Sequence, residues 1–211
     1  MNFEITLPYI REVLKKHSPS ILGYGVPSAV LVPLFERQGS VHILFTARGY
    51  DVEHHKGQIS FPGGVVENSD KSFYDTAIRE SREEIGLMSE DVEILGSLDE
   101  TFVTVSKFTI HPVVAVIPEK YKFTIQHKEV DRIITIPINV FLPESNNKKE
   151  YYEYENGCIW YGPTYLFGND VIWGATARIM DSFIKLIFSN INSQPDAQFS
   201  QGSKFYIPDS Y

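Results

Sequence analysis

The sequence has little cysteine, an excess of acidic over basic residues and no long hydrophobic run. Cys158 is the single cysteine, so the chain cannot form an internal disulfide bond, and a cysteine-rich zinc site is excluded. The 19 Lys and Arg residues against 27 Asp and Glu residues give a formal net charge of −8. This charge argues against a general nucleic-acid binder, which normally carries a basic patch or stripe.

Segments that would insert into a membrane are also missing. Apolar runs such as residues 113–117 are far too short to span a bilayer. Residues 1–6 contain an early acid and no apolar core flanked by basic residues, so the pattern does not predict a signal peptide. We therefore expect a soluble, cytoplasmic protein that associates with neither membranes nor nucleic acid.

The composition is that of an ordinary globular protein, with 43% hydrophobic and 22% charged residues. A length of 211 residues suits one substantial domain with a buried core. We expect this domain to cover residues 1–190, with residues 1–26 as a helical lead-in. Residues 191–211 are rich in Ser and Gln and are expected to form a polar tail.

Hydrophobic periodicity predicts three amphipathic helices, at residues 7–16, 73–86 and 174–188. Gly86 is placed to end the second helix, because glycine readily adopts the left-handed conformation of a helix C-terminus. The first helix should pack against the domain. The third should close the fold.

Runs rich in β-branched and aromatic residues predict strands between these helices. Residues 151–160 and 165–172 are expected to form an antiparallel pair around Gly162 and Pro163, and Pro112 is expected to mark an edge or a bend. The other predicted strands span residues 28–35, 41–46, 92–98, 108–117 and 132–136, and a hairpin loop is expected at residues 36–40.

A glycine-rich turn at residues 57–64 precedes the predicted helix that carries Glu80, Glu83 and Glu84. Spacings of three and four residues bring these carboxylates to one helical surface, where like charges repel. A hard cation such as Mg²⁺ removes the repulsion, because it takes oxygen ligands and completes its shell with water and substrate phosphates. A solvated charged helix would explain a lone acidic run. The upstream glycines favour a metal site that cleaves a phosphoanhydride.

These residues resemble the box of the Nudix hydrolase family, which joins a glycine and a glutamate to a run of Arg-Glu, two residues, Glu-Glu, one residue and Gly. Two positions differ from the box. Asp70 stands where the first glutamate is expected and is followed by eight residues instead of seven, and Ser81 replaces an apolar residue. The matching positions are Gly64, Arg79, Glu80, Glu83, Glu84, Gly86 and Leu87.

Within the family, the chain is similar to the coenzyme A pyrophosphatases. The similarity rests on the lengthened acidic loop, on residues 44–48 and 55–64 upstream of the helix, and on residues 172–178 downstream. Gly49 and Glu53 stand where that branch has a Ser or Ala and an Arg.

The resemblance implies an α+β Nudix fold, in which a mixed β-sheet is sandwiched between α-helices. It also implies a Mg²⁺ or Mn²⁺ cofactor and metal-assisted hydrolysis, in which the cation polarises a phosphate oxygen and a water of lowered pKa attacks phosphorus. We expect Glu80 and Glu84 to be metal ligands, with Glu83 as a third or bridging ligand. The main-chain carbonyl of Gly63 is expected to complete the shell.

Further catalytic groups are expected around this metal. Glu83 and Glu129 are candidate catalytic carboxylates, and Arg79 is expected to bond to a neighbouring carboxylate and orient it. The family resemblance suggests a carboxylate from a later loop, for which Glu129 is the first candidate and Asp99 and Glu100 are alternatives. An exposed loop acid is an equally good account of Glu129.

Basic residues near the glycine turn are candidates for binding substrate phosphates. They are Arg48, His55 and Lys56, and the Gly64 backbone is expected to approach the substrate closely. Each side chain is equally compatible with an exposed loop or strand end. Zinc at residues 53–55 is not expected, because consecutive loop residues make poor tetrahedral ligands.

We expect hydrolysis of a small-molecule, nucleoside-diphosphate-linked substrate. Coenzyme A or acyl-CoA is the first candidate, which the resemblance implies would be cut to 3′,5′-ADP and an (acyl-)4′-phosphopantetheine. ADP-ribose, NADH and nucleoside triphosphates are alternative substrates. A Nudix domain that senses nucleotides without catalysis is an alternative of another class. The sequence does not determine the oligomeric state, and a homodimer is compatible with it.

Overall fold

The computed structural model describes residues 5–49, 57–142, 148–153 and 159–192. All three predicted helices are present in this part of the chain, and the third extends four residues beyond its predicted end. The helices are α1 (Leu7–Lys16), α2 (Phe73–Ile85) and α3 (Gly174–Asn192), with the short 3₁₀ helices η1 (Ser89–Asp91) and η2 (Ile138–Phe141).

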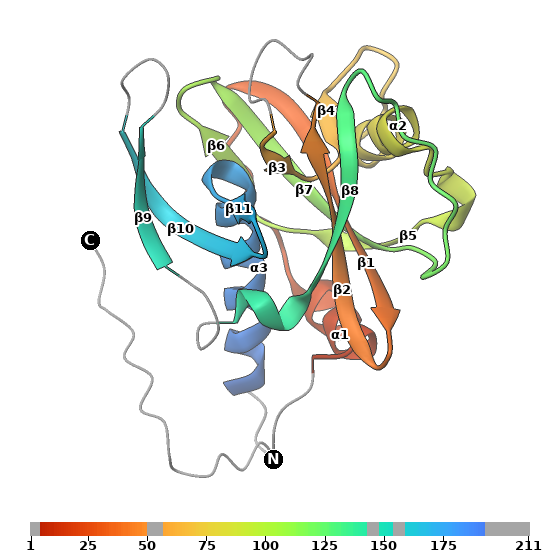
Figure 1. The fold of residues 1–211 in the computed structure, drawn as a ribbon, viewed down its shortest axis with the longest axis vertical. Coiled ribbons are helices and arrows are strands. Elements are labelled where there is room, and N and C mark those ends of the chain that lie inside the picture. Colours follow the sequence, from red (N-terminus) through yellow and green to blue (C-terminus); the bar gives the residue numbers. More distant parts are fainter. Residues whose placement is uncertain (1–4, 50–56, 143–147, 154–158, 193–211) are drawn as a thin grey trace.

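An eight-stranded mixed sheet lies at the centre of the described structure, and a separate three-stranded sheet lies beside it (Figure 1). The main sheet has the order β3-β2-β1-β7-β5, while β4 pairs with β1, β6 with β7 and β8 with β2. Strands β1 and β7 are parallel, and the other pairs are antiparallel. The smaller sheet has the order β11-β10-β9. The strands are β1 (Val26–Arg37), β2 (Ser40–Arg48), β3 (Ile59–Ser60), β4 (Gly63–Val65), β5 (Glu93–Ser97), β6 (Thr101–Val103), β7 (Phe108–Val116), β8 (Val130–Pro137), β9 (Lys148–Glu153), β10 (Ile159–Phe167) and β11 (Asp170–Ile172).

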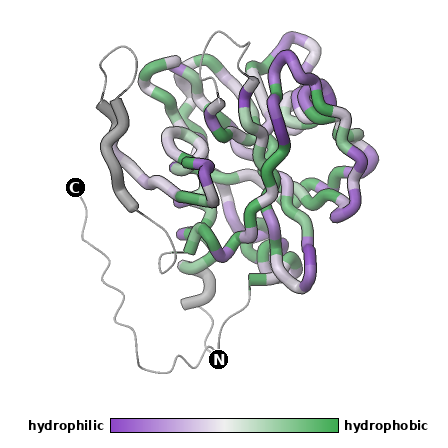
Figure 2. The backbone as a smooth tube through the Cα atoms, viewed as in Figure 1, coloured by the Kyte–Doolittle hydropathy of each residue, from purple (hydrophilic) through white to green (hydrophobic). Residues whose placement is uncertain are grey.

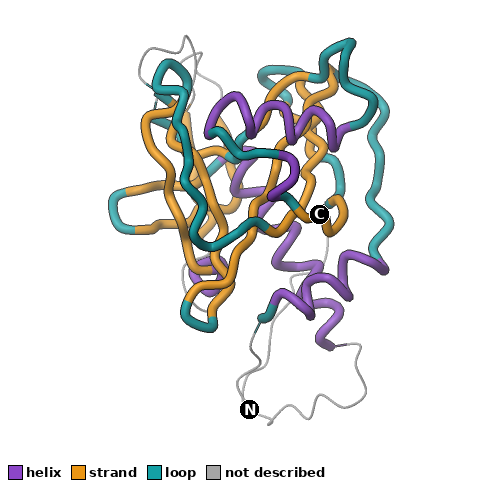
Figure 3. The backbone as a smooth tube through the Cα atoms, turned by 90° about the vertical axis from the view of Figure 1, so that its right-hand side faces the viewer, coloured by secondary structure: helices purple, strands orange, loops and turns teal. Residues whose placement is uncertain are grey.

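Helices cover both faces of the main sheet, which confirms the predicted sandwich (Figures 1 and 3). Helix α2 packs through Ala77 and Ile85 into a cluster that includes Leu31 of β1, whereas α1 and α3 pack into the cluster on the other face. The next residue along β1, Val32, belongs to that second cluster. Central strands are therefore buried on both sides, which explains their continuous apolar sequences. Figure 2 shows these hydrophobic stretches inside and hydrophilic loops outside.

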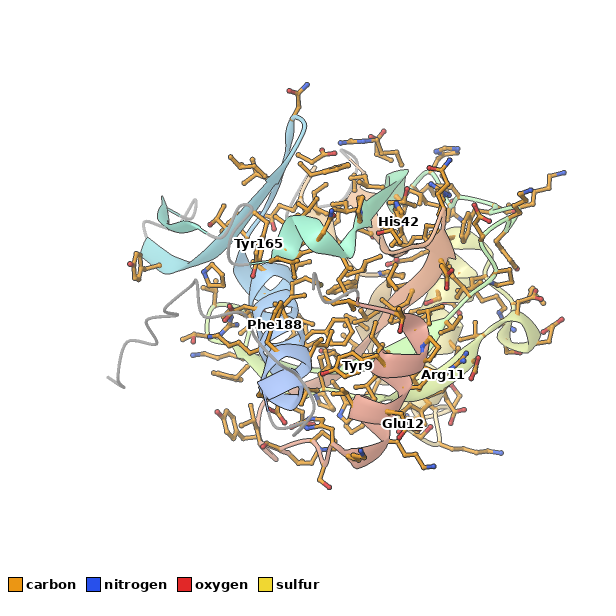
Figure 4. The ribbon with its side chains drawn as sticks, turned by 90° about the horizontal axis from the view of Figure 1, so that it is seen from below. Tyr9, Arg11, Glu12, His42, Tyr165 and Phe188 are labelled. Atoms are coloured by element: carbon orange, nitrogen blue, oxygen red, sulfur yellow. The ribbon has the colours of Figure 1, made fainter. Side chains whose placement is uncertain are left out.

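Helices α1 and α3 lie side by side on the same face of the main sheet (Figure 4). The Tyr9 hydroxyl on α1 donates a hydrogen bond to the Ile187 carbonyl on α3 at 2.8 Å. The residues expected to face inward on these helices are buried, which confirms the predicted amphipathic faces. They are Leu7, Ile10, Val13 and Leu14 on α1, and Ile179, Phe183, Ile184 and Ile187 on α3.

One prediction about a proline-containing segment is wrong, and another is wrong in part. Gly162 and Pro163 do not form a turn, because both lie inside β10, where they pair with β9. The turn falls instead between β10 and β11, after which Asp170 pairs back with Phe167. Pro112 does not mark a sheet edge, because it lies in the interior strand β7, between the residues that pair with β6 and those that pair with β5.

The ends of the chain leave parts of the predicted organisation untested. Residues 193–211 of the expected tail and residues 1–4 lie outside the described residues. The domain boundaries therefore stay predictions. Among the described residues, no helix has the length and apolar character needed to cross a bilayer.

Candidate active site

A cleft of about 520 Å³ lies between helix α2, the central sheet and the first turn of α3. Strand β4 pairs with β1 and leads into the loop before α2. Ser72 caps the helix by accepting a hydrogen bond from the Asp75 amide at 3.2 Å, and Gly86 ends the helix with φ of 69°. Held at both ends, α2 presents Glu80 and Glu84 to the cleft.

The cleft brings together four charged residues that the sequence singled out. Glu80 and Glu84 come from α2, Arg48 from the end of β2 and Glu129 from the residue before β8. Strands β2 and β8 are antiparallel neighbours whose register shifts beside Arg48. The Glu129 carbonyl accepts a hydrogen bond from the Gly49 amide at 2.8 Å at this irregularity. The pairing of β2 with β8, which are far apart in the sequence, thus places Glu129 in the cleft beside helix α2.

Arg79 connects the loop before α2 to the carboxylates on the helix. Its Nε and Nη2 donate to the two oxygens of Asp70 at 3.1 and 3.0 Å. Its Nη1 donates to Glu80 at 2.8 Å and to Glu83 at 3.3 Å, and Nη2 also donates to the Val65 carbonyl at 2.9 Å. The predicted bond between Arg79 and a neighbouring carboxylate is therefore present, and it fixes the orientation of Glu80.

Asp70 is the anchor of this network. Its side chain is only 3% exposed, and it also accepts hydrogen bonds from the Glu67 amide and the Thr76 hydroxyl, each at 2.9 Å. The bond from Arg79 is the main reason that the pKa of Asp70 falls to about 2. The same bond raises the pKa of Arg79. The pair therefore remains ionised at neutral pH.

The electrostatic environment of Glu84 is opposite to that of Asp70, because it raises the pKa of the carboxyl group. The residue is 6% exposed, and its Oε2 has no hydrogen-bond partner among the described residues. Burial raises the pKa of Glu84 to about 8, and the nearby Glu80 carboxylate adds to the rise, whereas Arg48 opposes it. Burial likewise raises the pKa of Glu80, against the hydrogen bond from Arg79. These acidic side chains would be stabilised as anions by a cation in the cleft.

The two glycines before α2 allow close contacts within the protein. A side chain at Gly63 would collide with β1, with its Cβ 2.6 Å from the Val30 Cα. A Cβ at Gly64 would overlap the carboxylate of Glu80. Glycine at position 64 thus leaves room for the Glu80 carboxylate against the backbone of β4.

The structure does not bring every candidate residue into the cleft. The Glu83 side chain is 50% exposed, bonds to Arg79 and is not part of the cleft lining. His55 and Lys56 lie outside the described residues. Their predicted roles in binding phosphates stay predictions, as does the role of Glu83 as a ligand.

Asp99 and Glu100 occupy a different place from Glu129. The Asp99 carboxylate accepts a hydrogen bond from the Ser20 amide at 2.8 Å, and the Glu100 carboxylate accepts one from the Leu22 amide at 2.6 Å. Neither acid lines the cleft. Both hold the segment before β1, so the geometry favours Glu129 as the later carboxylate of the site.

The donor set fits a hard divalent cation. In the part of the chain that the structure describes, no three His, Cys, Asp or Glu side chains form a ready metal cluster. Mg²⁺, however, is commonly held by one or two carboxylates together with water and substrate phosphates. Glu80 and the unpartnered oxygen of Glu84 supply such carboxylates.

Sequence reasoning missed the apolar part of the cleft. Trp173 is half-buried and lines the cleft. Val103, Phe108 and Ile110 line it from β6 and β7. Alternation along β7 places Phe108 and Ile110 on one face, but only the pairing of β6 with β7 shows that Val103 lies beside them.

Comparison with known proteins agrees with this geometry. The NUDIX domain family matches residues 25–154. The chain is 32% identical over 193 residues to Nudix hydrolase 15, mitochondrial, of Arabidopsis thaliana, covering 86% of this chain and 64% of that protein. It is 31% identical over 163 residues to the human mitochondrial coenzyme A diphosphatase NUDT8, covering 76% of this chain and 69% of that protein.

A solved structure supports the fold alone. The MutT protein from Methanosarcina mazei Go1 superposes with a TM-score of 0.50 at 14% identity, covering 83% of this chain and all of that one. The chain spans less than two thirds of the Arabidopsis relatives, 64% of Nudix hydrolase 15 and 61% of Nudix hydrolase 22. The family match covers more than half of the chain and includes the whole glutamate helix. The chain belongs to the Nudix hydrolase family.

Proposed function

We propose that this protein hydrolyses the diphosphate bond of coenzyme A or an acyl-CoA, releasing 3′,5′-ADP and an (acyl-)4′-phosphopantetheine. The observation that carries the proposal is that one cleft beside helix α2 is lined by Glu80, Glu84, Glu129 and Arg48. Three carboxylates and one guanidinium suit a polyanionic diphosphate only when a cation accompanies it.

Mg²⁺ or Mn²⁺ is the proposed cofactor, held by Glu80 and Glu84, with Glu83 and the Gly63 carbonyl as further candidate ligands. When bound, the cation supplies Lewis-acid polarisation of the phosphate oxygens. The unpartnered Oε2 of Glu84 supports this assignment, and so do the raised pKa values of Glu84 and Glu80, because burial disfavours the charged form of both carboxylates and a cation would favour it.

The other residues of the cleft have separate proposed roles. Arg79, braced by Asp70, holds the Glu80 carboxylate in position. The Glu129 carboxylate accepts the proton of the attacking water, which adds to phosphorus while the bond to the bridging oxygen breaks. The Arg48 guanidinium binds a non-bridging phosphate oxygen. Arg48 lines the cleft, and its Nε has no hydrogen-bond partner among the described residues.

The coenzyme A assignment rests on the sequence around the cleft. The lengthened loop that ends in the Asp70–Arg79 pair and the segments at residues 55–64 and 172–178 resemble those of the coenzyme A branch. The 31% identity to a human coenzyme A diphosphatase supports the same assignment.

A panel of diphosphates tests the proposal. Purified protein with Mg²⁺ or Mn²⁺ should cleave coenzyme A and acyl-CoA to equimolar 3′,5′-ADP and phosphopantetheine products, identified by mass spectrometry. ADP-ribose, NADH and nucleoside triphosphates should be cleaved at least tenfold less efficiently. Turnover of ADP-ribose with none of coenzyme A would overturn the substrate assignment, and binding of all of them without hydrolysis would favour a sensor.

Glu84→Gln tests the metal role with a second readout. At a cation concentration 100 times its Kd, the wild type should be stabilised by about 2.7 kcal/mol, measured as a rise in Tm. The variant should keep the fold, lose most of that rise and lose about 100-fold or more in kcat. Full activity and an unchanged metal-dependent rise in Tm would refute the role of Glu84.

A further inference from the structure

The cleft is lined by two chemically different groups of residues. The carboxylates and Arg48 form the charged group. An apolar group, which we call the apolar end, consists of Val30, Val103, Phe108, Ile110 and Ile179. It is built by strands β1, β6 and β7 together with the first turns of α3.

Strand pairing makes the apolar end a continuous surface. Val103 lies directly opposite Phe108 in the β6–β7 pair, and Ile110 lies opposite Ser28 in the β7–β1 pair. Phe108 and Ile110 share one face of β7 because side chains alternate along a strand. Both are half-buried, as is Val103, so apolar surface remains open to the cleft. Arg178 fastens α3 to this wall through a hydrogen bond to the Phe102 carbonyl at 2.8 Å.

Most hydroxyl groups along the cleft are already bonded within the protein. Ser28 Oγ donates to the Thr109 carbonyl at 3.1 Å, and Thr176 Oγ1 donates to the Ile59 carbonyl at 3.1 Å. Ser60 Oγ lies 3.2 Å from Thr46 Oγ1. Three of the four hydroxyl side chains that line the cleft are thus engaged. The Ser28 and Thr176 hydroxyls therefore have no donor left for a sugar, and a sugar hydroxyl that loses its hydrogen bonds to water without replacement costs free energy.

We propose that the apolar end binds the branched aliphatic part of the pantetheine arm and thereby selects pantetheine-linked over sugar-linked diphosphates. This inference rests on the proposed function. In coenzyme A, the carbon chain on the pantetheine side of the diphosphate carries two methyl groups on one quaternary carbon, close to the phosphate. In ADP-ribose or NADH a ribose occupies the corresponding position. Methyl groups match the branched side chains of Val30, Val103 and Ile110, whereas ribose does not.

The wild-type protein tests this proposal with one substrate analogue, a coenzyme A in which hydrogens replace the two methyl groups. Burying two methyl groups favours natural coenzyme A by about tenfold in kcat/KM. Equal kcat/KM for the two compounds would overturn the inference and leave the proposed function intact. No turnover of either compound, with cleavage of other diphosphates, would overturn the proposed function itself. The two failures are therefore distinguishable.

A pair of matched variants locates the selectivity. Val103→Ser puts a hydroxyl in the apolar end and should reduce the preference for natural coenzyme A over its analogue to about threefold or less. Val105→Ser makes the same change two residues away, at an exposed side chain outside the cleft lining. It should retain the full preference. Equal preferences in the two variants would overturn the assignment of the apolar end.

Discussion

Asp70 receives two hydrogen bonds from Arg79, one from Nε at 3.1 Å and one from Nη2 at 3.0 Å. This fork joins the loop before α2 to the residue that holds Glu80. The aspartate replaces the longer glutamate of the Nudix box and is followed by one extra residue. From the loop before α2, its short side chain still accepts both hydrogen bonds from Arg79, so the loop and the helix remain connected.

Asp70→Asn should lower the free energy of unfolding by about 2 kcal/mol at pH 7, because it removes charged hydrogen bonds to a mostly buried arginine. The pKa of Asp70 lies near 2 in the folded protein, below its ordinary value of 3.8. The stabilisation is therefore complete above about pH 4 and is lost as the pH falls towards 2. Urea unfolding at pH 7 and pH 3 should show a smaller wild-type advantage at pH 3. An advantage that grows on acidification would contradict this.

Glu84→Gln should change the pH dependence of stability in the opposite sense when metal is removed with EDTA. The pKa of Glu84 is raised from 4.5 to about 8, so its contribution to stability is complete below pH 4.5 and is lost as the pH rises through 8. Relative to the variant, the metal-free wild type should lose stability between pH 5 and pH 9. A constant difference in unfolding free energy between the wild type and the variant across this range would show that burial does not raise the pKa of Glu84.

Gly64→Ala should lower kcat by about 100-fold, because the new Cβ overlaps the Glu80 carboxylate and displaces it. Gly39→Ala is a suitable control. Gly39 has φ of 77° and open space around it, so the substitution should cost about 1 kcal/mol in stability without affecting kcat. Comparable losses of kcat in both variants would mean that the contact with Glu80 is not the cause.

Glu129→Gln and Asp99→Asn separate the two candidates for the later carboxylate. Glu129→Gln should lower kcat by about 100-fold with little change in Tm, as expected for the loss of a general base in a cleft. Asp99→Asn should lower Tm and leave kcat nearly unchanged. Asp99 accepts a hydrogen bond from the Ser20 amide and does not line the cleft. The reverse pattern, measured with coenzyme A and Mg²⁺, would move the catalytic role to Asp99.

Local sequence patterns predicted the helices well because each has a strong amphipathic stripe. Gly86 ends α2 as expected, in the left-handed conformation that favours glycine. The wrong turn at Gly162 and Pro163 has a physical explanation. Proline and glycine usually interrupt strands, but β10 pairs through both of them, and the chain reverses after Phe167 instead. Short strands such as β3 and β6 carry too few residues for a periodic signal, so only pairing with longer neighbours reveals them.

By itself, the sequence determined the spacing of Glu80, Glu83 and Glu84 on one helix, the glycines before it and the family that uses this combination, because these features depend on neighbours along the chain. Only the tertiary structure decided which of the glutamates face the cleft. It turns Glu83 to solvent, brings Arg48 and Glu129 together through the pairing of β2 with β8, and builds the apolar end from β1, β6, β7 and α3. These arrangements depend on the register of strands far apart in sequence, and a local pattern does not encode that register.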